Sequence, residues 1–162
     1  YRAKNPNALI PTIEDGDAVL WESNTILRYL AARHDGGTLW PADPVQRALA
    51  DRWMDWQFGY AEAQRPAFHG FVRKPPEQRD PVAIEQAIVA CNRMMTVLDA
   101  ALTTKPWLSG GSFGLGDVPM GVYAHTFFGL GLVREPVRHV ADWYERLKLR
   151  PGYAANVMIP LT

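Results

Sequence analysis

Near the start of the chain, residues 10–15 alternate between two sets, Ile10, Thr12 and Glu14 against Pro11, Ile13 and Asp15, and a second, apolar run follows at residues 18–21, beyond Gly16. Alternation with a period of two around a glycine turn is typical of a β-hairpin. The residues that follow change to helical spacing, with polar Glu22, Ser23 and Asn24 at the start. Apolar positions then recur at Ile26, Leu27 and Leu30. The pattern predicts a strand, a turn, a strand and a helix that ends near His34, where glycines follow.

From residue 44 onward the apolar positions recur at helical spacing only. Asp43-Pro44 and Asp80-Pro81 each combine an N-cap residue with a proline suited to the first helical position, so we expect a helix after each pair. The first helix carries an aromatic-rich stripe that we expect to face the core, made of Val45, Leu49, Trp53, Trp56 and Tyr60. The second carries the stripe Ile84, Ile88, Cys91, Met95, Leu98 and Leu102. Two such helices predict an antiparallel pair joined by a polar, proline-bearing loop at residues 73–79.

The last third of the chain predicts two more helices. Residues 118–132 read as a buried central helix, with His125 among its aromatic residues, and Pro136 opens a final long helix. The preceding loop is rich in glycine, but no Lys-Ser/Thr pair follows its last glycine, which argues against a phosphate-binding P-loop. The organisation expected from the pattern is a small α/β unit at residues 1–34, a linker at 35–43 and an all-helical unit at 44–162.

Composition excludes several classes of protein. The 162 residues carry 17 basic and 17 acidic side chains without a basic cluster, so a nucleic-acid partner is not expected. The longest stretch free of charged side chains, residues 118–133, is shorter than a membrane-spanning helix requires. Cys91 is the only cysteine, which precludes an internal disulfide and suits the reducing cytoplasm. The histidines show no metal-ligand spacing, so we expect no metal.

Two features near the hairpin point to a ligand. Pro11 opens an edge strand, and if the Ile10–Pro11 bond is cis, Ile10 can offer its N–H and C=O to an extended peptide. Ser23 lies at a helix N-terminus, where the helix dipole favours a carboxylate. Glu22 beside it can pair with an ammonium group. A small peptide with a carboxylate and an amine would satisfy all of these groups.

The stretch NPNALIP, the DGD turn and LWESNTILRYLA resemble cytosolic glutathione S-transferases of the bacterial, theta-like kind. The resemblance covers nearly the whole chain, and its Ile-Pro and Glu-Ser pairs are the most specific part. It implies the C-terminal half of a thioredoxin-like domain, a β-hairpin and a helix, followed by the all-helical bundle of the family. It also implies a homodimer, with glutathione as co-substrate and a small apolar electrophile as the second substrate.

The resemblance also implies roles for individual residues. Ile10, before the cis proline Pro11, would pair with the cysteinyl backbone of glutathione, and Glu22 and Ser23 would hold its γ-glutamyl end. Asn24 would assist them, and Asp51 would approach glutathione from the partner subunit. The apolar substrate pocket would include Trp56, Tyr60 and Phe68.

The resemblance has two further implications, one for the catalytic residue and one for the loop before residue 118. In the family a β-α-β unit precedes the point where this chain begins, and it carries the Ser, Cys or Tyr that activates the sulfur. The catalytic residue is therefore unknown, and we expect the 162 residues alone to be inactive. Asp117 matches the acid of the family's Ser/Thr-x-x-Asp capping box, whereas Gly114 replaces the hydroxyl residue, so half of this cap is expected to be missing.

Alternatives stay open at each of these positions. The proline can shape the fold without a ligand, Ser23 can cap its helix, and Asp51 can be a solvated surface acid. His125 can be a structural histidine rather than a pocket residue. At the level of function, the alternatives are another glutathione-dependent enzyme (an isomerase, a dehalogenase or a disulfide reductase) and a non-catalytic, transferase-like interaction module.

Overall fold

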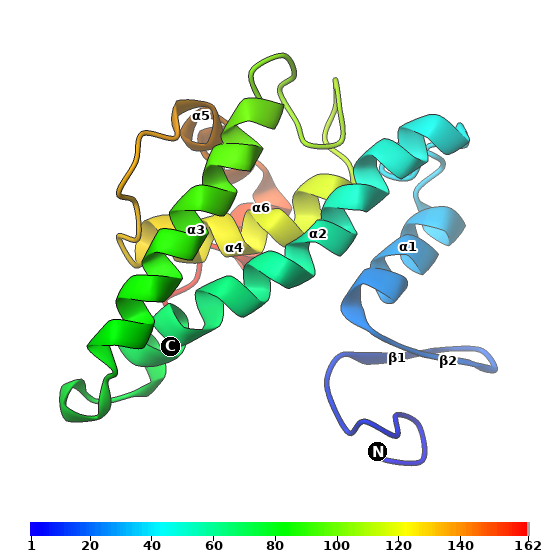
Figure 1. Ribbon diagram of the computed structural model, residues 1–162. Coiled ribbons are helices and arrows are strands. Elements are labelled where there is room, and N and C mark those ends of the chain that lie inside the picture. Colours follow the sequence, from blue (N-terminus) through cyan, green and yellow to red (C-terminus); the bar gives the residue numbers. More distant parts are fainter. Residues whose placement is uncertain (162) are drawn as a thin grey trace.

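The computed structural model describes residues 1–161 and begins with the predicted hairpin (Figure 1). Strand β1 (Thr12–Asp15) pairs antiparallel with β2 (Ala18–Trp21), and Asp15 lies opposite Ala18 across the turn. Gly16 has a φ of 59°, a value that glycine adopts without steric cost. Helix α1 (Ser23–His34) follows directly. The predicted order of strand, turn, strand and helix is confirmed.

Two long helices form the frame of the rest of the molecule. Helix α2 (Pro44–Phe68) and helix α3 (Pro81–Ala101) lie side by side and run in opposite directions (Figure 1). Both begin as predicted: Asp43 accepts a hydrogen bond from the N–H of Gln46, and Asp80 accepts bonds from Val82 and Ala83. Each side chain satisfies backbone donors that a helix start leaves without partners.

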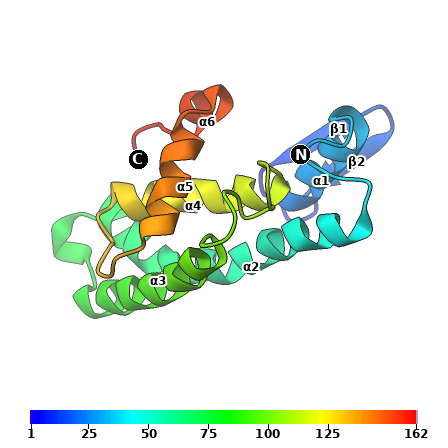
Figure 2. The same cartoon turned by 90° about the horizontal axis from the view of Figure 1, so that it is seen from above.

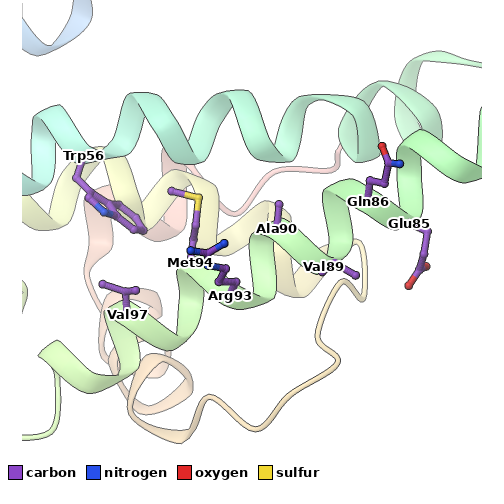
Figure 3. A pocket seen from close by; sticks show the side chains of 8 residues that line it. All are labelled: Trp56, Glu85, Gln86, Val89, Ala90, Arg93, Met94 and Val97. Atoms are coloured by element: carbon purple, nitrogen blue, oxygen red, sulfur yellow. The ribbon is translucent and has the colours of Figure 1, made fainter.

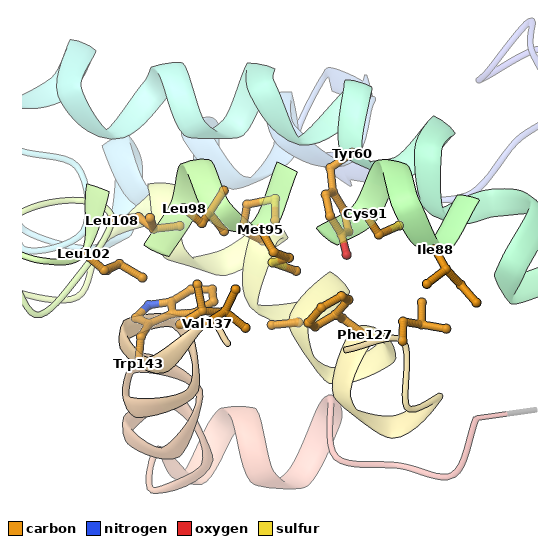
Figure 4. Packing of buried hydrophobic residues seen from close by; sticks show 14 of the residues in the cluster. Tyr60, Ile88, Cys91, Met95, Leu98, Leu102, Leu108, Phe127, Val137 and Trp143 are labelled. Atoms are coloured by element: carbon orange, nitrogen blue, oxygen red, sulfur yellow. The ribbon is translucent and has the colours of Figure 1, made fainter. Parts of the chain in front are cut away.

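The main core lies where α3 meets α2, α4 and α5, and most of the predicted apolar positions of α3 lie in it (Figure 4). The members of the predicted stripe on α3, Ile84 through Leu102, are all buried. Cys91 is fully buried, and burial raises the pKa of its thiol, as expected for an inert structural cysteine. On α2 the stripe is less complete, because Val45 in the first turn is 63 % exposed while Trp53 and Tyr60 are buried.

The last helices are shorter than predicted. Helix α4 (Val118–Gly129) ends before Leu132, because Gly131 adopts a φ of 63° and the N–H groups of Gly131 and Leu132 bond back to Phe128 and Phe127. Helix α5 (Arg138–Lys148) begins after Pro136, since Val137 has a non-helical backbone and is buried. A short helix α6 (Pro151–Asn156) follows it. Pro136 is therefore not the start of the last long helix.

The segment predicted as a loop at residues 73–79 connects α2 to α3 and contains one short helical turn. A π-helical turn (His69–Arg73) extends α2, and a 3-10 turn (Pro76–Gln78) follows. Pro66 inside α2 has no N–H to donate, and the hydrogen-bond pattern widens shortly after it. The polar, proline-bearing composition is thus compatible with short helical turns.

A second, smaller core holds α1 against the bundle. It consists of Ala31, Trp40, Met54 and Leu115, contributed by α1, the following segment, α2 and a 3-10 turn (Leu115–Asp117). This contact fixes the second half of α1 relative to α2. Within residues 1–161, none of the helices is both long and apolar enough to cross a membrane.

Candidate glutathione site

The loop before β1 presents unused backbone groups to solvent. The Ile10–Pro11 peptide bond is cis, as expected, and Ile10 is 87 % exposed. Within the described part of the chain, neither the N–H nor the C=O of Ile10 makes a hydrogen bond. The loop is held from behind, where Asn5 donates from its Nδ2 to the carbonyl of Leu9 at 2.7 Å. A fixed loop with free backbone groups can bind an added extended peptide.

The start of α1 lies after this hairpin and is also open. Glu22 precedes the helix with a φ of 70°, which is uncommon for a residue with a side chain and is found frequently at functional sites. Ser23 and Glu22 are both exposed, and no side chain caps the helix. The hydroxyl of Ser23 therefore does not cap α1, which was the alternative to a role in ligand binding. The first N–H groups of α1 stay available for an anion.

Asn24 has a different position from its two neighbours. It is 3 % exposed, and its Nδ2 donates to the carbonyl of Met54 at 2.8 Å and to Oε1 of Gln57 at 3.4 Å. Both partners belong to α2, so this side chain fastens α1 to the bundle. The local sequence gives no signal for this inward orientation, since Glu22, Ser23 and Asn24 are all polar.

Asp51 is engaged by an arginine. Its carboxylate lies 2.5 Å from Arg28, which also pairs with Asp55 at 2.8 Å. Burial lowers the pKa of Arg28, but the hydrogen bonds and negative charges of Asp51 and Asp55 outweigh this effect and raise it. Asp51 is thus an ion-paired residue between α1 and α2 rather than an acid surrounded by water.

The three predicted pocket residues lie in three different surroundings. Phe68 lines a cavity of about 350 Å³ between α2 and α4, opposite Tyr123. Tyr60 is fully buried, its hydroxyl accepts a hydrogen bond from Gln64, and burial raises its pKa. Trp56 lines a separate groove of about 660 Å³ on the outer face of α3 (Figure 3). Trp56 and Tyr60 stack, with ring centroids 6.2 Å apart, but the three residues do not line one cavity.

The cavity beside Phe68 contains a residue to which the sequence assigned no role in the site. Tyr123 forms one wall, its ring lies 5.8 Å from that of Tyr60, and burial raises the pKa of its hydroxyl. Arg65 and His69 reach the same cavity. Helical spacing shows which residues share a face of α4, but it does not show which part of α2 that face meets.

His125 makes structural contacts. Its Nδ1 bonds the hydroxyl of Tyr144 at 2.9 Å, and its Nε2 bonds the carbonyl of Ile159 at 3.1 Å. These bonds connect α4, α5 and the segment after α6, as expected for a structural histidine. Among residues 1–161, no three His, Cys, Asp or Glu side chains are grouped so that they could hold a metal ion.

The hairpin, the cis proline, the open start of α1 and the helical bundle define a class of protein. The chain belongs to the glutathione S-transferase family, and the family model described as "Glutathione S-transferase, N-terminal domain" matches residues 1–38. The thioredoxin-like and helical fold expected from the resemblance is confirmed.

Particular relatives support this assignment. The chain is 40 % identical over its whole length to glutathione S-transferase GstB of Escherichia coli K12, of which it covers 79 %. It is 45 % identical to a theta class glutathione S-transferase of Xanthomonas axonopodis pv. citri solved with glutathione bound, with a TM-score of 0.95 over 100 % of this chain and 78 % of that one. It is also 33 % identical to the disulfide-bond oxidoreductase YfcG of Escherichia coli K12, with 91 % of this chain and 71 % of that protein covered.

Proposed function

We propose that this chain binds glutathione as the co-substrate of a transferase reaction with a small apolar electrophile. The observation that carries the proposal is the exposed, unbonded backbone of Ile10 in the same α/β unit as the uncapped start of α1. The first can pair with the cysteinyl part of a tripeptide, and the second can bind its γ-glutamyl carboxylate. The glutathione that is bound to the theta class relative supports the same assignment.

Each residue has a positioning role in this proposal. The hydroxyl of Ser23 and the first N–H groups of α1 would hold the carboxylate, and Glu22 would pair with the ammonium group. Pro11 keeps the adjacent Ile10 backbone turned outward. These groups orient the tripeptide, and its thiolate then attacks an electrophilic carbon, forming a C–S bond while the leaving group departs.

The apolar substrate is assigned to the cavity between α2 and α4. Phe68 and Tyr123 provide its aromatic walls, and its volume of about 350 Å³ suits a small molecule. Trp56 and Tyr60, the other two expected pocket residues, are not part of this lining. Asn24 would act indirectly, by fixing the start of α1 through its bond to Met54.

Transferase activity is favoured over other glutathione-dependent reactions. The relatives that carry the name of a transferase are 40 % and 45 % identical to this chain, whereas the named oxidoreductase is 33 % identical. A non-catalytic interaction module would not need an open α1 start beside an unused Ile10 backbone. A chain with this function would suit the cytoplasm, because its single thiol, Cys91, is buried and forms no disulfide.

Calorimetric titration with glutathione tests the proposal. Ser23→Ala removes a charge-assisted hydrogen bond and should weaken binding about tenfold. Glu22→Gln removes an exposed ion pair and should weaken it about threefold. Thr25→Ala, on the same turn and also exposed, is the matched control and should bind like the wild type. Equal affinities for the Ser23 and Thr25 variants would refute the assignment of Ser23.

We also infer two features of organisation. Residues 1–34 would be the glutathione-binding unit and residues 44–162 the helical unit, joined by residues 35–43.

The outer groove on α3 would be the contact of a homodimer, because Val89 and Val97 are 60 % and 50 % exposed in it. Glu85 and Arg93 flank Val89 on the same face (Figure 3). A two-fold axis near Val89 would pair Glu85 of each copy with Arg93 of the other. Asp51 does not line this groove and pairs with Arg28 of its own chain, and its approach to the glutathione of the partner subunit is a separate part of the proposal.

A further inference from the structure

The cavity between α2 and α4, two helices that pack against each other (Figure 2), contains buried polar groups that have no role in the proposed glutathione site. Ala61, Phe68 and Val122 form apolar parts of its lining, as an apolar electrophile requires. Gln64 of α2 and Thr126 of α4 also line it, although they are only 2 % and 7 % exposed. Two polar side chains that are more than nine-tenths buried thus border the place assigned to the second substrate.

Gln64 is held in place by its amide nitrogen. Its Nε2 donates to the hydroxyl of Tyr60 at 3.2 Å and to the backbone carbonyl of Tyr123 at 3.3 Å. Because a carbonyl oxygen only accepts, the bond to Tyr123 determines which end of the Gln64 amide is the nitrogen. Within residues 1–161, the Oε1 of Gln64 accepts no hydrogen bond. A nearly buried acceptor in a fixed position is therefore free for a donor from another molecule.

Thr126 presents an unpaired hydroxyl from the other helix of the cavity. A threonine inside a helix can bond the carbonyl one turn earlier, as the hydroxyl of Thr96 does with the carbonyl of Asn92 at 3.0 Å. Thr126 makes no such bond, and its hydroxyl has no other partner in the described part of the chain. This hydroxyl can therefore donate a hydrogen bond to a ligand, and it can accept one as well.

Both oxygens can be reached from the cavity. Among residues 1–161, the polar side-chain atoms that are fully enclosed and have no partner are Nε1 of Trp53 and Nε of Arg146. The unpaired oxygens of Gln64 and Thr126 are therefore not enclosed by protein, and the cavity is the space that their side chains border. Leaving nearly buried polar groups without partners costs free energy, so a ligand that pairs them is favoured over an apolar ligand of the same shape.

The chemistry of these two oxygens favours a neutral polar group over an ion. The arginine of the lining, Arg65, forms an ion pair with Glu62 at 2.6 Å, so its charge is already matched. The Oε1 of Gln64 needs a donor, which a carboxylate does not have. A carboxamide offers its N–H to Gln64 and its C=O to the hydroxyl of Thr126, and therefore satisfies both groups without burying a charge.

We propose that the second substrate is an electrophile whose apolar body carries one neutral carboxamide. The carboxamide N–H donates to the Oε1 of Gln64, and its C=O accepts from the hydroxyl of Thr126. This inference rests on the proposed function, because it takes the cavity between α2 and α4 as the place of the electrophile. Gln64 and Thr126 determine specificity in it, since they bind the polar group of the substrate and not the carbon that reacts.

Titration with three unreactive probes of similar shape, followed by NMR, tests the proposal. 4-Methylbenzamide donates and accepts hydrogen bonds, 4′-methylacetophenone only accepts them, and 4-isopropyltoluene does neither. None carries a leaving group, so their binding depends on neither turnover nor glutathione. Thr126→Val should weaken the amide and the ketone about tenfold and leave the hydrocarbon unchanged, whereas Thr126→Ser should bind all three like the wild type. Gln64→Met should weaken only the amide, again about tenfold.

Two further variants serve as controls. Phe68→Ala removes an aromatic wall of the cavity and should weaken all three probes. Thr96→Val makes the same substitution on α3, outside the cavity lining, and should bind the probes like the wild type. If Phe68→Ala leaves all three unchanged, they bind elsewhere and the assignment of this cavity is refuted.

The comparison of probes separates polar recognition from a change in the shape of the cavity. If Gln64→Met and Thr126→Val bind the amide like the wild type, or weaken all three probes equally, the roles of the two oxygens are refuted. Calorimetry of glutathione binding to both variants should match the wild type. A failure of the glutathione site would therefore be seen in that titration alone, and a failure of the carboxamide proposal in the probe titrations alone.

Discussion

Gly114 and Ser109 occupy one small volume in the loop before α4. The hydroxyl of Ser109 accepts a hydrogen bond from the N–H of Gly116, which is the donor that a serine at position 114 would be expected to satisfy. A Cβ atom at Gly114 would lie 2.8 Å from both the Cβ and the Oγ of Ser109. The hydroxyl that position 114 lacks is thus supplied by Ser109, five positions earlier. The backbone at Gly114 is extended, so the constraint there is steric rather than conformational.

The two positions should therefore be coupled. Gly114→Ser alone should lower the free energy of unfolding by about 2 kcal/mol, because it overpacks the site. Ser109→Gly alone should cost about 1 kcal/mol, through the lost hydrogen bond. The double variant should be more stable than the sum of the two by about 1 kcal/mol or more, since serine 114 then has room to cap the helix. Urea denaturation of the four proteins measures this, and additive effects would contradict the shared-volume explanation.

Asp117 completes the same arrangement. The family resemblance matched Asp117 to the acid of a capping box, and its carboxylate accepts bonds from the preceding loop, from the N–H groups of Leu108, Ser109 and Gly114. Its fourth donor, the indole N–H of Trp143, belongs to α5 and could not be predicted from local spacing. Burial raises the pKa of Asp117, although hydrogen bonds from Ser109 and Trp143 act in the opposite direction. The bonds of Asp117 to nearby backbone could thus be predicted from a local motif, whereas its bond to a residue on a distant helix could not.

At the scale of elements, the same distinction decides which helix boundaries could be predicted. The starts of α2 and α3 were found because Asp43 and Asp80 cap the helix that follows them directly. The start of α5 was missed because its cap is Asp99, at the end of α3, which accepts the N–H of Val140 at 3.0 Å from 41 positions away. In the site, the exposure of Ile10 and Ser23 followed from local sequence, but the inward turn of Asn24 depends on α2.

Asp99 should make the stability of the protein depend on acid pH. Burial raises the pKa of Asp99, but hydrogen bonds from His139 and from the backbone of Val140 outweigh this effect and hold it below its usual value. A folded-state pKa below the unfolded value of about 4 means that the carboxylate stabilises the fold above that pH. This contribution is lost as the pH falls through the folded-state pKa.

Asp99→Asn should therefore lower the free energy of unfolding at pH 7 by about 1 kcal/mol, and the difference from the wild type should shrink below about pH 4. Thermal or urea unfolding between pH 2 and pH 7 measures both. Asp142→Asn, an exposed acid on α5 that makes no hydrogen bond in the described residues, is the control. A difference that stays constant across this range would contradict the capping role of the charged form.

At the scale of the whole molecule, the expected homodimer can be tested by reversing charges in the groove on α3. If Glu85 pairs with Arg93 of a second copy, Glu85→Arg and Arg93→Glu should each weaken dimerisation at least tenfold, because each places like charges opposite one another. The double charge swap should restore the dimer. Sedimentation at several concentrations measures the association, with Arg138→Glu on another face as the control. Dimers of equal strength in all variants would show that this face is not the contact.

The central claim is that glutathione binds where the Ile10 loop and the start of α1 are open. The most direct test is a titration of the ¹⁵N-labelled chain with glutathione, followed by the amide NMR shifts of each residue. We predict that the amides of Ile10, Glu22 and Ser23 shift together along one saturation curve, while those of Val89 on α3 and Arg150 beside α6 do not move. Shifts confined to other parts of the chain, or no saturable shift at Ile10 and Ser23, would contradict the assignment of this site.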